Sequence, residues 1–443
     1  MPTTTSTPLP TLIFIPGAWH LPTCYTKLIT HLQTHHPTLN CTTITLPSTT
    51  GDPSATFKDD ISAARAAITH ETLHHGRNVV LIAHSYGGMV ANSAIKGFTV
   101  PQTPTSGTII GLILIASGFT LTGFSFMDPF LGRPPPSWRA NHTTGFAELV
   151  TSPSELFYHD LPEEEARYWV SQLRPQSLKA LFEGGEYSYA GWKDVPCWYI
   201  GTEEDRGLPV LMQRVGVGIA RGMCPPGWRV VYREVEGASH SVFLSRVEVV
   251  SGLVWEAVEG FLRRKDLGFE GDGRKGVDSY WESQGVVVPE ADVWSVSTWF
   301  KYGVPAALGR GVGWGFALVG WVRGIDRAYC LSVCLHDEIQ VVDAIILLLS
   351  IIISSHVYQL LKRVMYDFTD KIARKYIPSI PTSYYIHISG MIGMYPNLLI
   401  ISSLNDWDAK NLFEVRTANS YILYTNCIDT RSRGSSFCLR NLK

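Results

Sequence analysis

Two short apolar segments constrain the fold of this chain more than any other feature. Residues 78–83, "NVVLIA", and 109–116, "IIGLILIA", are almost uninterrupted runs of aliphatic side chains. Such runs are typical of strands that are buried on both faces of a sheet. A sheet of this kind needs helices on both sides, so the two segments predict the centre of an α/β domain.

The surrounding chain repeats the same alternation of strand and helix. Further strand-like segments cover 11–15, 41–46, 197–201 and 228–235, and helical periodicity covers 25–32, 57–68, 207–221 and 242–264. Strands separated by helices predict a mostly parallel sheet flanked by helices. We therefore assign residues 11–265 to one α/β domain.

Residues 119–193 interrupt this alternation. They are rich in aromatic residues, proline and glycine, and one helical segment, "PEEEARYWVSQL", covers 162–173. A long irregular stretch inside a compact domain is more often a lid or binding element than a passive loop. We interpret it as an inserted cap, with a wandering loop as the alternative.

Residues 266–443 lack this regularity and form a C-terminal extension of unknown fold. Within it, "AIILLLSIIISSHVYQLL" (344–361) is uncharged over 18 residues, which just reaches the length of a membrane helix. The alternatives are a buried or amphipathic helix, or sequence that does not fold. The amino terminus lacks the features of a secretion signal. We expect a cytoplasmic protein, or one associated with a membrane through 344–361.

Composition narrows the class of partner. The formal net charge is -2, and no long run of lysine and arginine offers a track for phosphates, so nucleic acid is not expected as a partner. The eight cysteines are scattered and are expected to be reduced. Cys330 and Cys334 have no second pair of ligands nearby, so neither a metal nor a cofactor is predicted. A small molecule is the expected partner, and the oligomeric state is left open.

Ser85 is the candidate nucleophile. It ends a buried strand and precedes a helical segment in "VVLIAHSYGGMV", with small residues two positions before and after it, Ala83 and Gly87. A tight strand-turn-helix element that exposes a serine needs small residues at these positions. The alternative is a serine that only caps the following helix.

A serine nucleophile needs a base and an acid that orients the base. His240 follows the last predicted strand and precedes the last helix, whereas early histidines such as His20 are expected to be solvated. Glu203, Glu204 and Asp205 follow the strand at 197–201. The order serine, acid, histidine is the order used by one class of α/β enzymes.

The oxyanion of such a reaction needs main-chain N–H donors. One is expected from Tyr86, directly after the nucleophile, and one after the first strand, where Gly17 lets the chain turn and Ala18 or Trp19 presents its N–H.

The segments "IPGAWH", "AHSYGG", "TEEDRGLP" and "GASHSVFLSR" resemble the α/β-hydrolase superfamily. They are similar to its small cytosolic esterase group of bacteria and fungi, which is related to plant methyl esterases and hydroxynitrile lyases. The resemblance covers about 11–264 and includes the microbial cap. It implies Ser85 as nucleophile, His240 as base, Asp205 as acid with Glu204 as alternate, and Ala18 and Tyr86 as the oxyanion hole.

The expected activity is hydrolysis of an ester or lactone of a small, largely apolar molecule through an acyl-enzyme, in secondary metabolism. The expected substrate-binding residues are Trp19, His84, Phe124, Phe126 and Trp192. The alternatives are a C–C hydrolase or lyase that uses the same triad, and a non-hydrolytic binding protein on this fold. Ser241 stands where the cyanide-releasing lyases have a lysine, which argues against lyase chemistry.

Overall fold

The structure is a computed structural model, and it describes part of the chain. The described residues are 8–130, 132–224, 230–267, 280–289, 295–316, 412–417 and 420–425. The chain divides into two units, Met1–Cys334 and Leu335–Lys443. The described part of the second unit is an antiparallel hairpin of β11 (Leu412–Thr417) and β12 (Ser420–Thr425).

The predicted membrane segment, 344–361, lies outside the described residues. Among the helices that are described, none combines the length and the apolar character needed to cross a bilayer. Membrane association through 344–361 therefore stays a prediction.

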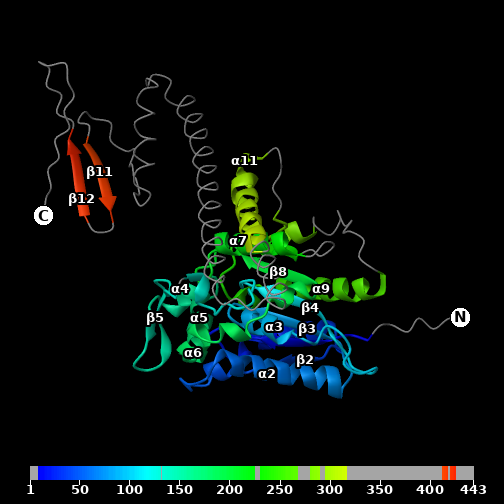
Figure 1. Ribbon diagram of the computed structural model, residues 1–443. Coiled ribbons are helices and arrows are strands. Elements are labelled where there is room, and N and C mark those ends of the chain that lie inside the picture. The colour runs from blue at the N-terminus through cyan, green and yellow to red at the C-terminus, as the bar shows by residue number, and fades with distance from the viewer. Residues whose placement is uncertain are drawn as a thin grey trace, which may run out of the picture. The chain divides into compact units, whose positions relative to one another are not determined.

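A seven-stranded sheet lies at the centre of the first unit (Figure 1). Its order is β10-β9-β8-β4-β3-β1-β2. The strands are β1 (Thr11–Ile15), β2 (Cys41–Thr43), β3 (Val79–His84), β4 (Ile109–Ile115), β8 (Cys197–Thr202), β9 (Val230–Val235) and β10 (Val286–Val287). All neighbours are parallel except β10, which pairs antiparallel with β9. The predicted α/β fold with a mostly parallel sheet is confirmed.

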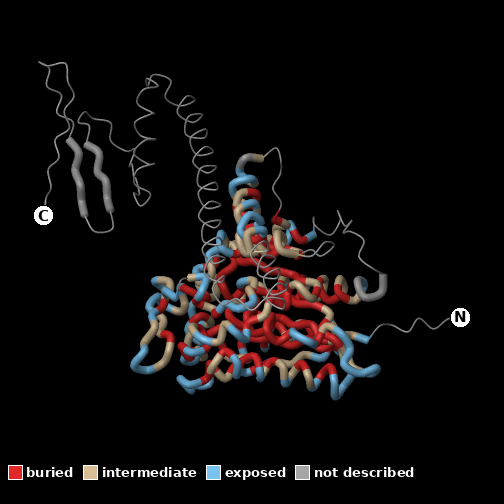
Figure 2. Tube along the Cα trace, in the orientation of Figure 1, coloured by how far each residue is buried: buried red, intermediate tan, exposed pale blue. Residues whose placement is uncertain are grey.

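Helices cover both faces of this sheet. They are α1 (Thr26–His35), α2 (Phe57–Thr69), α3 (Gly87–Ala94), α7 (Val210–Met223), α8 (Val242–Ser245) and α9 (Val247–Leu267). Alternate residues of β3 enter two separate cores: Leu81 packs with α2 and α3, and Ile82 packs with α1 and α9. The buried centre of the domain is visible in Figure 2. This double burial explains why β3 and β4 are apolar throughout.

Single helical turns complete the connections. They are η1 (Pro22–Tyr25), η2 (Pro47–Thr49), η3 (His70–His74), η4 (Asp128–Phe130), η5 (Gly185–Tyr187) and η6 (Gly191–Lys193), and η3 is a π-helical turn.

The inserted region has more structure than the sequence predicted. Its helices are α4 (Pro153–Phe157), α5 (Glu163–Gln172) and α6 (Leu178–Phe182), and α5 confirms the predicted helical segment. A small antiparallel sheet joins β5 (Trp138–Asn141), β6 (Phe146–Leu149) and β7 (Gln176–Ser177). Strands of two to four residues are too short to show a period-2 pattern, so this sheet was not predicted.

Part of the predicted extension packs on the α/β domain. Trp281 is buried, β10 extends the sheet, and a helical segment runs through α11 (Val296–Thr298), the π-turn η7 (Trp299–Gly303) and 304–316. Small residues let this segment approach α7 closely. A Cβ at Gly218 would lie only 2.7 Å from the carbonyl oxygen of Ala306.

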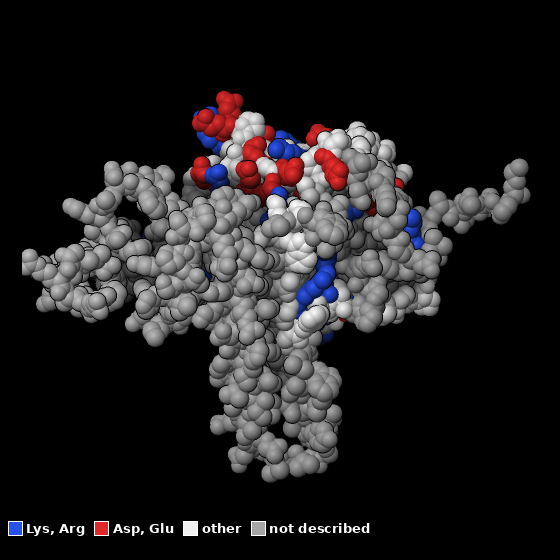
Figure 3. Space-filling view, turned by 90° about the horizontal axis from the view of Figure 1, so that it is seen from above, with Lys and Arg blue, Asp and Glu red and all other residues white. Residues whose placement is uncertain are grey.

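Figure 3 shows the face of the molecule seen from above. Acidic side chains of the described residues gather near one edge of this view, with basic side chains among them.

Candidate active site

Ser85 lies in a tight turn between β3 and α3. Its φ is 51°, in the left-handed region that is costly for a residue with a side chain. A Cβ at Gly87 would lie 2.6 Å from the carbonyl oxygen of Ile15, so only glycine fits there. Ser85 is partly exposed, whereas every other residue from 79 to 95 is buried. The turn therefore presents the one side chain that can meet a substrate.

Two more strained residues lie at the same edge of the sheet. Trp19 has a φ of 63° and follows β1, and Ala116 has a φ of 45° and follows β4. Since β1, β3 and β4 are parallel neighbours, all three strained residues follow the carboxyl ends of adjacent strands. Strain of this kind clusters at functional sites, and in open α/β sheets ligands bind at this edge.

His240 and Asp205 form a buried pair. His240 lies between β9 and α8, and its Nδ1 is 2.8 Å from Oδ2 and 3.0 Å from Oδ1 of Asp205. A carboxylate can only accept, so Nδ1 carries the proton and Nε2 is left as a base. A Cβ at Gly207 would lie 3.1 Å from the imidazole ring, so a glycine there lets the loop after β8 approach His240 closely.

The Asp205 carboxylate is held by four further donors. Thr202 Oγ1 and Gln213 Nε2 donate to Oδ2 at 2.7 and 3.0 Å, and the N–H groups of Gly207 and Leu208 donate to Oδ1 at 2.8 and 2.7 Å. This network fixes the carboxylate that orients His240. Gln213 was not predicted, because nothing in the sequence of α7 marks it as a partner of the acid.

The structure distinguishes between the two candidate acids. Asp205 is 6% exposed and contacts His240, whereas the side chain of Glu204 lies on the surface. Glu204 takes part in the loop through its main chain: its carbonyl oxygen accepts a hydrogen bond from His159 Nε2 at 2.8 Å. The geometry therefore favours Asp205 as the partner of the base.

His84 holds the main chain of His240 in place through a hydrogen bond. It is fully buried, and its Nε2–H donates to the carbonyl oxygen of His240 at 3.0 Å. Burial, with His240 nearby, holds the pKa of His84 well below its usual range. His84 was expected to line a pocket; the structure places it behind the turn, where it fixes the backbone of His240.

The prediction that His20 is solvated was wrong. His20 is 3% exposed, because the chain after β1 folds inward beneath the inserted region. Its Nδ1–H donates to the carbonyl oxygen of Ala18 at 2.7 Å, and its Nε2 accepts from the Tyr158 hydroxyl at 2.8 Å. Burial lowers the pKa of His20 to about 4. A neutral His20 therefore anchors the loop that was predicted to carry an oxyanion donor.

Of the predicted oxyanion donors, Tyr86 directly follows Ser85, and Ala18 follows Gly17, where a Cβ would lie 3.0 Å from the Cβ of Ser85. Ala18 and Tyr86 are buried, and Tyr86 is the N-cap of α3, where backbone N–H groups favour an anion. The Tyr86 hydroxyl donates to Asp60 Oδ2 at 2.7 Å, which fixes the residue in place. The N–H of Trp19 is directed at Gln176 Oε1, 3.4 Å away, so Ala18 is the better candidate of the two.

The predicted substrate-binding aromatics separate into two groups. Trp19 packs 6.0 Å from Phe157, whose ring is 5.6 Å from His240, and Phe126 packs 5.5 Å from Tyr86. These rings lie beside the proposed triad and oxyanion hole.

The other two aromatic residues, Phe124 and Trp192, contact other parts of the structure. Phe124 is 36% exposed and contacts Phe316. Trp192 is 1% exposed, and its indole N–H donates to the carbonyl oxygen of Thr120 at 2.8 Å, so it forms part of the core under the insertion.

The sheet topology and the strained turn after β3 are those of a hydrolase of the α/β type. The profile described as "Alpha/beta hydrolase family" matches residues 12–252, more than half of the sequence, so the chain belongs to the alpha/beta hydrolase family. It is an enzyme of the hydrolase class that acts on a small molecule.

Comparison with individual proteins finds relatives of low identity. The "Alpha/beta hydrolase nvfD" of Aspergillus novofumigatus is 26% identical over 208 residues, which cover 46% of this chain and 81% of that protein. Polyneuridine aldehyde esterase is 18% identical, with a TM-score of 0.44, over 56% of this chain and 99% of its own. Tomato methylketone synthase I bound to 2-tridecanone is 14% identical, with a TM-score of 0.44, over 58% of this chain and 100% of its own. A pyrethroid hydrolase from Sphingobium faniae is 18% identical, with a TM-score of 0.45, over 57% of this chain and 98% of its own.

Proposed function

We propose that this chain is a serine hydrolase that cleaves an ester or lactone bond of a small, largely apolar molecule through an acyl-enzyme on Ser85. One observation carries the proposal. A buried His240–Asp205 pair, joined at 2.8 Å, lies at the same sheet edge as a strained and partly exposed serine. A serine hydroxyl reacts at neutral pH only when a base and an orienting acid accompany it.

The reaction follows from these positions. Ser85 Oγ attacks the substrate carbonyl carbon while His240 Nε2 takes its proton. The oxyanion forms between the N–H groups of Ala18 and Tyr86. His240 returns the proton to the leaving alcohol as the C–O bond breaks. Water, deprotonated by His240, then attacks the acyl carbon, and the proton returns to Ser85 as the acid leaves.

An apolar substrate is supported by the aromatic side chains near the proposed triad. Trp19 contacts both Trp138 and Phe157, at ring distances of 6.0 Å, and Phe126 contacts Tyr86. Apolar walls with few convergent polar groups are typical of small-molecule sites. A role in secondary metabolism and a cytoplasmic location stay predictions.

A complete base and acid pair favours catalysis over a purely binding role, because a binding protein has no need for it. The five hydrogen-bonding groups around Asp205, from Thr202, Gly207, Leu208, Gln213 and His240, hold the carboxylate in one orientation. An orienting acid of this kind serves a base that must take up a proton.

The test uses the full chain with a panel of p-nitrophenyl esters, lactones and cyanohydrins, and labelling by a serine-directed phosphonate. We expect ester or lactone turnover, covalent labelling of the wild type, and loss of at least ~10^3-fold activity and of labelling in Ser85→Ala. Ser62→Ala, an exposed serine on α2, is the matched control and should change neither.

Two results would count against the proposal. A folded wild type that phosphonate does not label would favour the binding protein. Turnover of cyanohydrins alone, lost in Ser85→Ala, would favour the lyase.

A further inference from the structure

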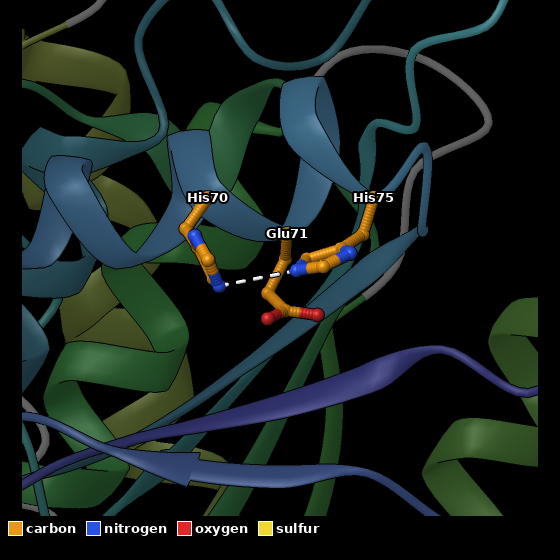
Figure 4. A group of neighbouring side chains, drawn as sticks. All are labelled: His70, Glu71 and His75. Atoms are coloured by element: carbon orange, nitrogen blue, oxygen red, sulfur yellow. Dashed lines mark hydrogen bonds between the residues drawn. The ribbon is translucent and has the colours of Figure 1, made fainter.

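A second cluster of reactive side chains lies at the opposite edge of the sheet from Ser85. His70, Glu71 and His75 lie in and just after η3, the π-helical turn that follows α2 and precedes the amino end of β3 (Figure 4). In a π-helical turn the backbone bonds link residues five apart, so His70 and His75 fall on one face. An ordinary α-helical turn would direct these two rings apart.

The three side chains converge as ligands of one ion would. The Nε2 atoms of His70 and His75 are 3.1 Å apart, and one ligand atom from each of the three residues lies within 4.8 Å of the others. Two imidazole nitrogens bound to one tetrahedral zinc, with Zn–N of about 2.0–2.1 Å, stand about 3.3 Å apart. The two nitrogen atoms are therefore already near the separation that one ion requires, and side-chain rotation would bring the Glu71 carboxylate to the same distance.

The Glu71 carboxylate is held in position from behind. Thr11 Oγ1 donates to Oε2 at 2.7 Å, and Arg77 Nη1 donates to the same oxygen at 3.1 Å. Metal-binding carboxylates are commonly oriented by such partners. Since both bonds engage Oε2, we assign Oε1 to the ion.

We propose that His70, Glu71 and His75 form a binding site for a divalent transition-metal cation of the zinc type, with water completing the coordination. Two imidazoles with one carboxylate suit zinc, nickel or copper better than magnesium or calcium, which prefer oxygen ligands. His70 and His75 are exposed, so the cation can enter from solvent. Arg77 places a positive charge behind the carboxylate, which lowers the affinity below that of a buried four-ligand site.

The bound cation would join three parts of the domain. His70 and Glu71 follow α2, His75 belongs to the connection to β3, and Glu71 is bonded to Thr11 at the start of β1. The site would therefore stabilise the amino edge of the sheet without touching the proposed catalytic residues. The competing explanation of the 3.1 Å contact is a direct N–H···N hydrogen bond between two neutral imidazoles.

The experiment titrates Zn²⁺ into the chelator-treated full chain by calorimetry and follows the melting temperature in parallel. We expect one ion per chain, a higher melting temperature, and an apparent dissociation constant raised at least about 10-fold by either His70→Gln or His75→Gln. Both variants should retain the hydrolytic activity of the metal-free enzyme. His142→Gln, which removes an exposed histidine elsewhere, is the matched control and should bind as the wild type does.

Two outcomes would overturn the proposal. One is the absence of saturable binding to a folded wild type. The other is binding that both histidine variants keep but that a His31→Gln and His35→Gln double variant loses. His31 and His35 form another closely spaced imidazole pair, on α1, with ring centroids 4.3 Å apart.

Discussion

Acidic pH should destabilise the domain through His20. Burial lowers the pKa of this imidazole to about 4, whereas it is 6.5 in an unfolded chain. Between these values the unfolded state binds more protons than the folded state, so the free energy of unfolding falls as the pH falls. The contribution of His20 is fully present above about pH 6.5 and is lost as the pH approaches about 4.

The size of the effect follows from the two pKa values. One pKa unit corresponds to about 1.4 kcal/mol, so the complete loss below pH 4 is about 3.4 kcal/mol. At pH 5 the proton uptake of the unfolded chain lowers the free energy of unfolding by about 2 kcal/mol relative to pH 7.5. His84, whose pKa burial also lowers, acts in the same direction and adds to the total.

Urea unfolding of the full chain at pH 7.5 and pH 5.0 measures this loss. His20→Gln removes the titrating group, so the loss between the two pH values should be smaller by about 2 kcal/mol than in the wild type. His142→Gln, which changes an exposed histidine, should leave the wild-type dependence intact. A loss in His20→Gln equal to that of the wild type would refute the reasoning.

Three further predictions concern the candidate triad, the turn and the sheet edge. Asp205→Asn should lower kcat by about 10^3 to 10^4-fold on the best ester, whereas Glu204→Gln should stay within about 3-fold; equal losses would contradict the assignment of the acid. Gly87→Ala should lower kcat at least about 100-fold, because the added Cβ would overlap the Ile15–Pro16 backbone and displace Ser85. Native far-UV circular dichroism of the variant is the control for folding. Turnover equal to that of the wild type would show that the turn tolerates the methyl group. Trp281→Ala should lower the free energy of unfolding by about 3 kcal/mol in a urea titration at pH 7.5, and an unchanged midpoint would mean that this ring is not part of the core.

The central strands were predictable because two-sided burial leaves an unambiguous apolar run. Leu81 and Ile82 enter different cores, so side chains on both faces of β3 are apolar. The turn after β3 was predictable because a serine flanked by small residues directly follows a buried strand, although the backbone that crowds Gly87 belongs to Ile15 and Pro16. Both features leave a recognisable pattern within a short stretch of sequence.

Features that leave no pattern in the sequence around them were not predictable. His20 is buried by Tyr158, more than a hundred positions away, and nothing near His20 in the sequence indicates this contact. Asp205 was preferred to Glu204 only through the family resemblance, and the contact with His240 that distinguishes the two residues is visible only in the structure. The two-residue strand β10 is too short to show a period.

Strand β10 covers part of an edge of the sheet through which two copies of this chain could otherwise pair. Val286 and Val287 pair with Glu234 and Val235, so they occupy part of the outer edge of β9. An uncovered edge of a buried, apolar strand presents free N–H and C=O groups that can pair with the same edge of another molecule. A chain ended at residue 265 would expose this edge and the apolar surface under Trp281, and would therefore self-associate in proportion to its concentration. We therefore expect the residues that follow α9 to limit self-association through this edge.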